Sequence, residues 1–251
     1  MKTGETLMNE KLKAAMSAAI KKKEITLSDG NRVVVRPMLV KELKIMSANV
    51  ESQKDPLDFM ADVVKSCVVE GKVDIATLPL FDYEKLLFDI LKLGRSSPII
   101  SVPFVCKNEI DGKECGTEIK VDSNLNTVRL SREPDSLVKL NNMVSVKMRY
   151  PNMTEISYFD TKNYADAFDL AWRLVEEVHF NGDIMKVGID VKAEDLLELS
   201  EYVSAEEMTP MFDFTNNMPR LVMDVSVKCQ TCGYHEPIRL TGIDEIMYEA
   251  K

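Results

Sequence analysis

The sequence contains little of what most enzymes need for catalysis. Among its 251 residues there are two histidines, His179 and His235, and neither belongs to a recognisable metal or nucleophile motif. The ten glycines form no phosphate-binding loop and no dinucleotide fingerprint. Paired carboxylates such as Glu176-Glu177 are typical of solvated helix faces. The sequence therefore predicts a protein that is not an enzyme.

Long apolar stretches and an excess of positive charge are also missing. No stretch approaches the roughly 18 apolar residues of a membrane span. The first 23 residues carry six lysines, whereas a secretory signal has an apolar core. Lysine and arginine number 32 against 41 aspartates and glutamates, so the net charge is −9, which argues against a nucleic-acid coat. With 45% hydrophobic residues, the composition predicts a soluble, acidic, folded protein.

The five cysteines contain the most informative pattern. Cys229 and Cys232 are separated by two residues and followed by Gly233, a spacing with which a tight turn presents both thiolates to one metal ion. Cys106 and Cys115 lie between two other strand-like segments. Four thiolates at the tips of two hairpins complete a closed, tetrahedral site of the zinc-ribbon type. We therefore predict a structural Zn²⁺ site made by Cys106, Cys115, Cys229 and Cys232.

The first cysteine pair departs from the usual spacing, since eight residues separate Cys106 from Cys115. A turn at Asp111-Gly112 is predicted to bring these two thiols together. Three alternatives remain open: a ribbon without metal, a redox dithiol at the C-terminal pair, and His235 in place of one cysteine. Cys67 lies among valines of a predicted helix and is interpreted as an inert core thiol.

Apolar periodicity and turn signals divide the chain into helical and strand segments. Asp29-Gly30, between two β-branched runs, predicts a hairpin within residues 24–36. The core side of a helix that starts at Pro37 is predicted to consist of Leu39, Leu43, Ile45 and Met46. Further helices are expected at residues 7–20, 56–69, 82–93, 163–180, 193–203 and 205–217, and from residue 244. Further strands are expected at residues 99–105, 117–121, 138–149, 154–159, 221–228 and 237–240.

These segments predict an α+β fold with a helical N-terminal part and zinc-ribbon-like β hairpins split by a mixed α/β insertion. The expected parts of the chain are an amphipathic helix or arm at residues 1–23, a hairpin with a helical region at 24–97, ribbon halves at 98–130 and 219–242, the mixed insertion at 131–218, and a C-terminal helix at 243–251.

Two apolar surfaces are candidates for partner binding. In the first, Leu12, Met16 and Ile20 share one face of the N-terminal helix. So short a helix is marginal alone in water, so we expect this arm to be ordered where a partner covers that face. The second is an adaptable, methionine-rich surface for a client protein. It consists of Met208, Met211, Phe212, Phe214 and Met218.

The order of several short segments resembles that of a known family. Residues 35–45, beginning Val35-Arg36-Pro37-Met38, lead into helices, and Leu78-Pro79-Leu80-Phe81-Asp82 opens the helix that ends near Gly94. Cysteine-bearing strands follow, and a second cysteine pair lies close to the C-terminus. From about Val33 to the end, this order resembles the baseplate assembly proteins of T4-type bacteriophages. The N-terminal extension through Lys23 and the wide spacing of the first cysteine pair depart from the resemblance.

The resemblance implies a virus-encoded, non-enzymatic role in building the central hub of the tail baseplate, as a minor hub component or as an assembly chaperone. The implied partners are baseplate hub and other tail proteins, in the cytoplasm of the infected host cell and in the virion tail. Two other classes of function stay open from the residues alone: a zinc-ribbon regulator that binds nucleic acid, and a thiol oxidoreductase. The regulator would need a basic stripe near the cysteines, where lysines are interspersed with acidic residues.

Overall fold

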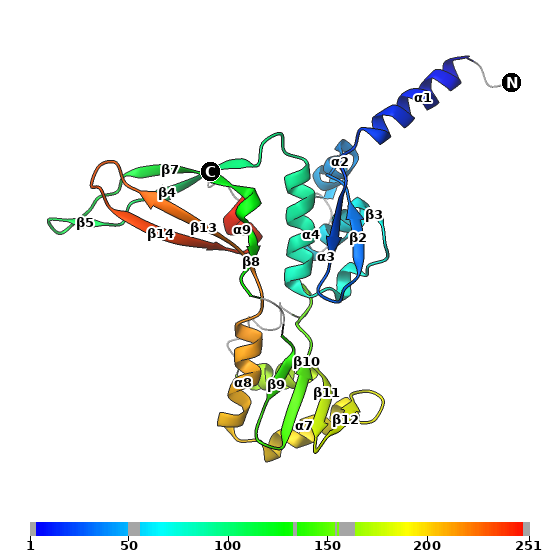
Figure 1. Cartoon of the computed structure of the whole chain (residues 1–251), viewed down its shortest axis with the longest axis vertical. Coiled ribbons are helices and arrows are strands. Elements are labelled where there is room, and N and C mark those ends of the chain that lie inside the picture. Colours follow the sequence, from blue (N-terminus) through cyan, green and yellow to red (C-terminus); the bar gives the residue numbers. More distant parts are fainter. Residues whose placement is uncertain (1–3, 50–55, 133–134, 154, 156–163, 248–251) are drawn as a thin grey trace. The chain divides into compact units, whose positions relative to one another are not determined.

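The computed structural model describes residues 4–49, 56–132, 135–153, 155 and 164–247. The chain forms two compact units, one of residues 1–75 and 85–98, the other of residues 76–84 and 99–251. Helices and several small antiparallel sheets alternate in both units, which confirms the predicted α+β class (Figure 1). In the part of the chain that is described, no helix has the length and apolar character needed to cross a membrane.

The first unit contains a three-stranded antiparallel sheet with the order β1-β2-β3. The predicted turn at Asp29-Gly30 is confirmed: it joins β1 to β2, and Gly30 adopts a φ of +85°, which glycine tolerates without strain. Buried valines and Cys67 fill the core beside the sheet. The elements are α1 (Gly4–Ala18), β1 (Lys23–Thr26), β2 (Arg32–Val35), α2 (Val40–Asn49), α3 (Pro56–Cys67) and β3 (Val68–Glu70), and α4 (Leu80–Leu93) runs through both units.

The predicted core of the second helix is wrong at two positions. The helix begins at Val40 rather than at Pro37, and Leu43 and Ile45 are 50% and 54% exposed. Glu42 is instead only 1% exposed. Its carboxylate accepts a hydrogen bond from the Arg36 guanidinium, with 2.8 Å between Nη2 and Oε1, so the helix turns this charged residue inward.

One half of the second unit is a β ribbon, which we define as the hairpins β4–β7 and β13–β14 with their connecting turns. The strands predicted at residues 99–105 and 221–228 have these bounds in the structure. Strand β8 pairs with the start of β13 and extends the second hairpin to three strands. The elements are β4 (Ile99–Val105), β5 (Glu109–Ile110), β6 (Lys113–Glu114), β7 (Glu118–Asn124), β8 (Arg129–Leu130), β13 (Leu221–Lys228), β14 (His235–Thr241) and α9 (Gly242–Met247).

The rest of the second unit is a four-stranded antiparallel sheet with the order β12-β11-β10-β9, and helices that share its core. Trp172, Leu174, Leu196 and Met208 are among the buried residues of this core. The strands are β9 (Leu137–Lys139), β10 (Val144–Met148), β11 (Val175–Phe180) and β12 (Asp183–Lys186). The helices are α6 (Tyr164–Arg173), α7 (Ala193–Leu199) and α8 (Ala205–Asn216), with a 3₁₀ turn at Ser200–Tyr202.

The helix predicted at residues 163–180 is wrong in its second half. The helix α6 ends at Arg173, and β11 follows it and pairs with both β10 and β12. Asn181 and Gly182, with φ angles of 52° and 90°, form the turn between β11 and β12, and this pair is a strong hairpin signal that the helical interpretation overlooked. The strand predicted at residues 154–159 lies, apart from Glu155, outside the described residues.

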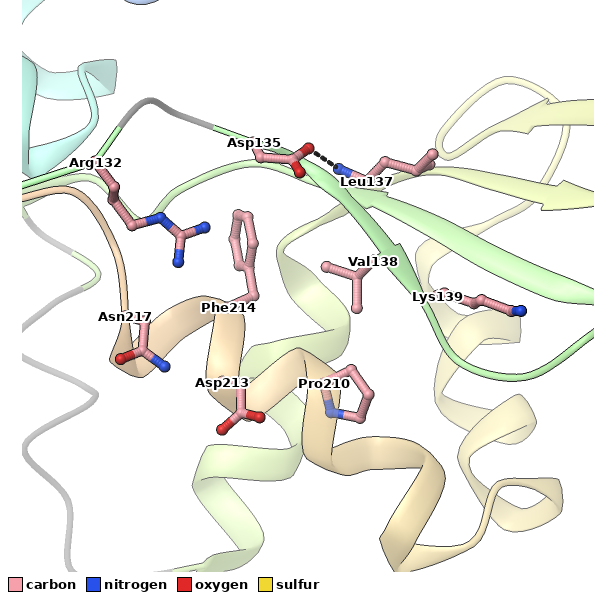
Figure 2. A pocket seen from close by; sticks show the side chains of 9 residues that line it. All are labelled: Arg132, Asp135, Leu137, Val138, Lys139, Pro210, Asp213, Phe214 and Asn217. Atoms are coloured by element: carbon pink, nitrogen blue, oxygen red, sulfur yellow. Dashed lines mark hydrogen bonds between the residues drawn. The ribbon is translucent and has the colours of Figure 1, made fainter.

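The predicted methionine-rich client surface is also contradicted. Met211 is 0% and Phe214 is 5% exposed, so both belong to the core, as does Met208. The Phe214 ring stacks on Tyr150 with 4.4 Å between centroids. Phe212 is half-buried and packs edge-on against Phe168. Phe214 is among the residues that line a pocket beside β9 and α8 (Figure 2), and this pocket has a volume of about 370 Å³.

Candidate metal centre

The four cysteines of the ribbon lie at the ends of its strands. Cys106 directly follows β4, and two residues separate Cys115 from the start of β7. Cys229 directly follows β13, and Cys232 lies in the turn before β14. Strands β7 and β13 contact each other (Figure 1), and the cysteines at the tips of the two hairpins meet. The fold thus brings together two cysteine pairs that are far apart in the sequence.

The sulfur atoms are spaced as ligands of one metal ion. All four lie within 4.8 Å of one another. Cys106 Sγ is 3.6 Å from Cys232 Sγ, and Cys115 Sγ is 3.8 Å from Cys229 Sγ. A tetrahedral ion with Zn–S bonds of about 2.3 Å requires about 3.8 Å between its sulfur ligands. The cluster therefore has the dimensions of a closed zinc site.

Local backbone chemistry builds both cysteine turns. Gly116 and Gly233, each directly after a cysteine, have φ angles of +65° and +74°, a conformation that side chains other than glycine rarely adopt. In both turns this glycine donates its N–H to the carbonyl of the hairpin's first cysteine, Cys106 or Cys229. The two cysteine turns therefore share the same glycine conformation and the same closing hydrogen bond.

The long insertion in the first turn forms a small hairpin of its own. Strands β5 and β6 pair, and Asp111 and Gly112 take left-handed φ angles of 51° and 78° between them. The Cys115 N–H then bonds to the Asn108 carbonyl, which closes the base of this hairpin. The predicted turn at Asp111-Gly112 is confirmed, and it explains how eight intervening residues still leave Cys106 and Cys115 side by side.

The electrostatics of the cluster favour a bound cation. Hydrogen bonds from the backbone amides of Cys232 and Thr231 lower the pKa of Cys229 to about 6, and the Thr117 hydroxyl lowers the pKa of Cys115. Cys106 accepts a backbone hydrogen bond, yet burial and the neighbouring sulfurs raise its pKa to about 12. Four adjacent sulfurs cannot all be thiolates without a positive charge among them, and a divalent ion supplies that charge.

Two polar side chains beside the sulfurs were not predicted from the sequence. Thr117 Oγ1 is 3.2 Å from Cys115 Sγ, and Asn108 Nδ2 donates to Cys232 Sγ over 3.7 Å. Such neighbours orient thiolate ligands and neutralise part of their charge. Thr117 lies two residues after Cys115, but threonine at such a position is too common in strands to be a signal.

The remaining candidate residues are not members of the four-cysteine cluster. His235 Nε2 is 2.7 Å from Ser226 Oγ, and the described metal-ligating group consists of cysteines alone. Cys67 is buried in the first unit, where burial raises the pKa of its thiol. On α1, Leu12 and Met16 are 57% and 66% exposed, whereas Ile20 is half-buried and lies two residues beyond the end of α1 at Ala18. Nothing in the structure tests whether these three residues bind a partner.

A comparison with protein families gives one match. A family model described as T4 bacteriophage base plate protein matches residues 19–248, which is most of the chain. No curated protein and no solved structure matches the sequence.

Proposed function

This chain belongs to the T4 bacteriophage base plate protein family, and we propose that it helps to build the central hub of the tail baseplate through protein–protein contacts, without enzymatic activity. The family match over residues 19–248 carries the proposal. We further propose that it acts as an assembly chaperone or minor hub component, that it meets hub and tail proteins in the host cytoplasm, and that it resides in the virion tail if it is a component.

The test is isolation of a tagged copy of the chain from infected cells. We expect baseplate hub proteins to co-purify with it, and mass spectrometry of purified particles separates the two roles. A hub component remains in the finished tail, whereas a chaperone is absent from it. Recovery of the tagged chain without any baseplate or tail protein would contradict the proposal.

We propose that the ribbon, with halves at residues 98–130 and 219–242, binds one structural Zn²⁺ through Cys106, Cys115, Cys229 and Cys232. The sulfur spacing and the closed set of four ligands support zinc, and such a site leaves no position for a substrate. Its function is then to hold the two hairpins of the ribbon together while the mixed insertion at residues 131–218 separates them in the sequence.

The two alternative functions receive less support from the ribbon. Arg129 and Arg239 both pair with Asp224, at 2.7 Å each, so its carboxylate offsets one of their two positive charges and less charge is left for a phosphate backbone. For a thiol oxidoreductase, the reactive pair normally lies at the start of a helix. Here Cys229 and Cys232 lie in a β turn, with two further cysteines against them.

Deletion of residues 1–20 tests whether α1 is a partner-binding arm. Because Met8, Leu12 and Met16 are 74%, 57% and 66% exposed, their removal forfeits little apolar burial, and we expect the free energy of unfolding to change by less than about 1 kcal/mol. The deletion leaves in place the ion pairs of Lys22 with Glu70 and of Lys23 with Asp89.

Binding to hub proteins, in contrast, should weaken by tenfold or more, which corresponds to about 1.4 kcal/mol or more. Leu12→Ser with Met16→Ser is the matched variant, because it keeps the length of the helix and removes its apolar face. A large loss of stability with unchanged binding would show that α1 is part of the folded body. Strong protection of its amides from hydrogen exchange in an isolated monomer would show the same.

A further inference from the structure

The four cysteines of the cluster differ in their solvent exposure. Cys106 and Cys229 are 5% and 1% exposed, whereas Cys115 and Cys232 are only half-buried. The sulfur of each half-buried cysteine lies next to that of a buried cysteine on the other hairpin, with 3.6 Å between Cys232 and Cys106 and 3.8 Å between Cys115 and Cys229. An accessible thiol next to a protected second thiol is the arrangement in which oxidation ends in a disulfide.

We propose that this cluster is also an oxidative modification site, at which a hydroperoxide converts the four cysteines into two disulfides, Cys106–Cys232 and Cys115–Cys229, that each join the two hairpins. The proposal rests on the proposed function in one respect, since a baseplate component leaves the reducing host cell with the particle. Outside the cell, thiolate ligands are exposed to oxidants and disulfides persist. The disulfides would then replace the metal as the link between the hairpins, because they connect the same two hairpin tips.

The chemistry balances with hydrogen peroxide as the oxidant. The Cys232 sulfur attacks the peroxide, the O–O bond breaks, and one oxygen leaves as water while the sulfur becomes a sulfenic acid. The Cys106 sulfur then attacks that sulfur, the S–O bond breaks, and a second water leaves. The same two steps at Cys115 and Cys229 consume a second peroxide. Four thiols and two peroxides give two disulfides and four waters. Where Zn²⁺ is bound, the four sulfurs start as thiolates, so four protons are taken up from solvent to give the same four waters, and the ion departs without any change in its oxidation state.

The sulfur contacts favour pairing across the hairpins. All four sulfurs lie within 4.8 Å of one another, and the two cross-hairpin pairs are 3.6 and 3.8 Å apart. The C-terminal turn is already closed by the hydrogen bonds from the Gly233 N–H to the Cys229 carbonyl and from the Cys229 N–H to the Tyr234 carbonyl. A Cys229–Cys232 bond would lie within this one turn, whereas each cross-hairpin bond would form between sulfurs that are already in contact.

The test treats the purified full-length chain with increasing hydrogen peroxide. Released zinc is measured with a colorimetric chelator, and disulfides are mapped by mass spectrometry after tryptic digestion without reductant. We expect about one zinc released for every two peroxides consumed. We also expect one complex of three peptides, because Lys228 and Arg239 bound a single peptide that contains both Cys229 and Cys232. Fragmentation of that peptide between its two cysteines assigns each bond.

The results separate this proposal from the zinc proposal. An intrapeptide Cys229–Cys232 disulfide with a Cys106–Cys115 bond, or sulfinic acids without any disulfide, would overturn the cross-hairpin assignment whatever the zinc content. The predicted disulfides in a chain that never contained zinc would overturn the zinc site and leave this proposal intact. Cys67, buried in the other unit, is the internal control and should stay reduced. If Cys115→Ser with Cys229→Ser folds, it should still form the Cys106–Cys232 bond.

Discussion

Removal of the metal from the four-cysteine cluster is expected to unfold the ribbon. Apparent binding free energies of structural zinc sites reach about 10–16 kcal/mol, which is comparable to the roughly 5–15 kcal/mol that stabilise a whole domain. Strand β7 of the first hairpin buries little by itself, since it alternates between exposed and half-buried residues along most of its length. We therefore expect protein purified without chelator to contain about one zinc per chain, and a strong chelator to abolish the ordered ribbon.

Single Cys→Ser replacements distinguish the four proposed zinc ligands from Cys67, which is the remaining cysteine. Cys106→Ser, Cys115→Ser, Cys229→Ser and Cys232→Ser should each lower the zinc content measured by elemental analysis and lower the melting temperature. Cys67→Ser is the matched control and should keep its zinc, because Cys67 lies in the other unit. Acid should release the metal as protons compete for the sulfurs, and this includes Cys229, whose pKa is about 6 in the metal-free cluster. Equal zinc content in all five variants would contradict the site.

The features that could be predicted from the sequence are those that local chemistry determines. Glycine after aspartate gave the turns at Asp29-Gly30 and Asp111-Gly112, because a left-handed backbone is needed at a tight hairpin. The strands that precede the cysteines were predicted for a similar reason, since β-branched runs that end at a cysteine or glycine favour the extended conformation of a strand. The proximity of the two cysteine pairs followed from the recurrence of one turn motif rather than from any prediction of tertiary structure.

The predictions were wrong where a segment fits both the helical and the strand periodicity, or where residues distant in the sequence determine which side chains are buried. Val175 and Val178, three residues apart, fit a helical face as well as a strand, and pairing with β10 and β12 selects the strand. Met211 and Phe214 were interpreted as surface residues because nothing local shows that Tyr150 stacks on Phe214 or that both residues belong to one core with it. Glu42 was missed because a charged residue is buried only when a partner from another element meets it.

The partner of Glu42 is Arg36, and replacement of either residue alone is expected to destabilise the first unit strongly. Their side chains are 1% and 7% exposed and lie 2.8 Å apart. The Ser66 hydroxyl and the Leu39 N–H also donate to the Glu42 carboxylate, at 3.1 and 2.9 Å. Glu42→Ala leaves the guanidinium buried without its counter-charge, and such a loss typically costs about 3–5 kcal/mol. Denaturant unfolding of the full chain measures the difference.

Two comparisons show whether burial of the Arg36–Glu42 ion pair causes this loss of stability. Glu24 pairs with Arg32 at 3.6 Å, but both side chains are well exposed, so Glu24→Ala should cost less than about 0.5 kcal/mol. Arg36→Met with Glu42→Leu removes both charges together and should be much less harmful than either single change, because no buried charge is left unpaired. A cost for Glu42→Ala no larger than that for Glu24→Ala would contradict the argument.

The same pair predicts how stability depends on pH. Burial opposes ionisation of Glu42, yet the bonds from Arg36, Leu39 and Ser66 prevail and lower its pKa from 4.5 to about 2. The folded state therefore releases this proton more readily than the unfolded chain does. The contribution of Glu42 to stability is fully present above about pH 4.5 and is lost as the pH falls toward 2. In Glu42→Gln this part of the acid sensitivity should disappear. The difference in unfolding free energy between the natural chain and Glu42→Gln should therefore shrink as the pH falls from about 4.5 toward 2. A difference that stays constant over this interval would show that the carboxylate is not ionised in the folded protein.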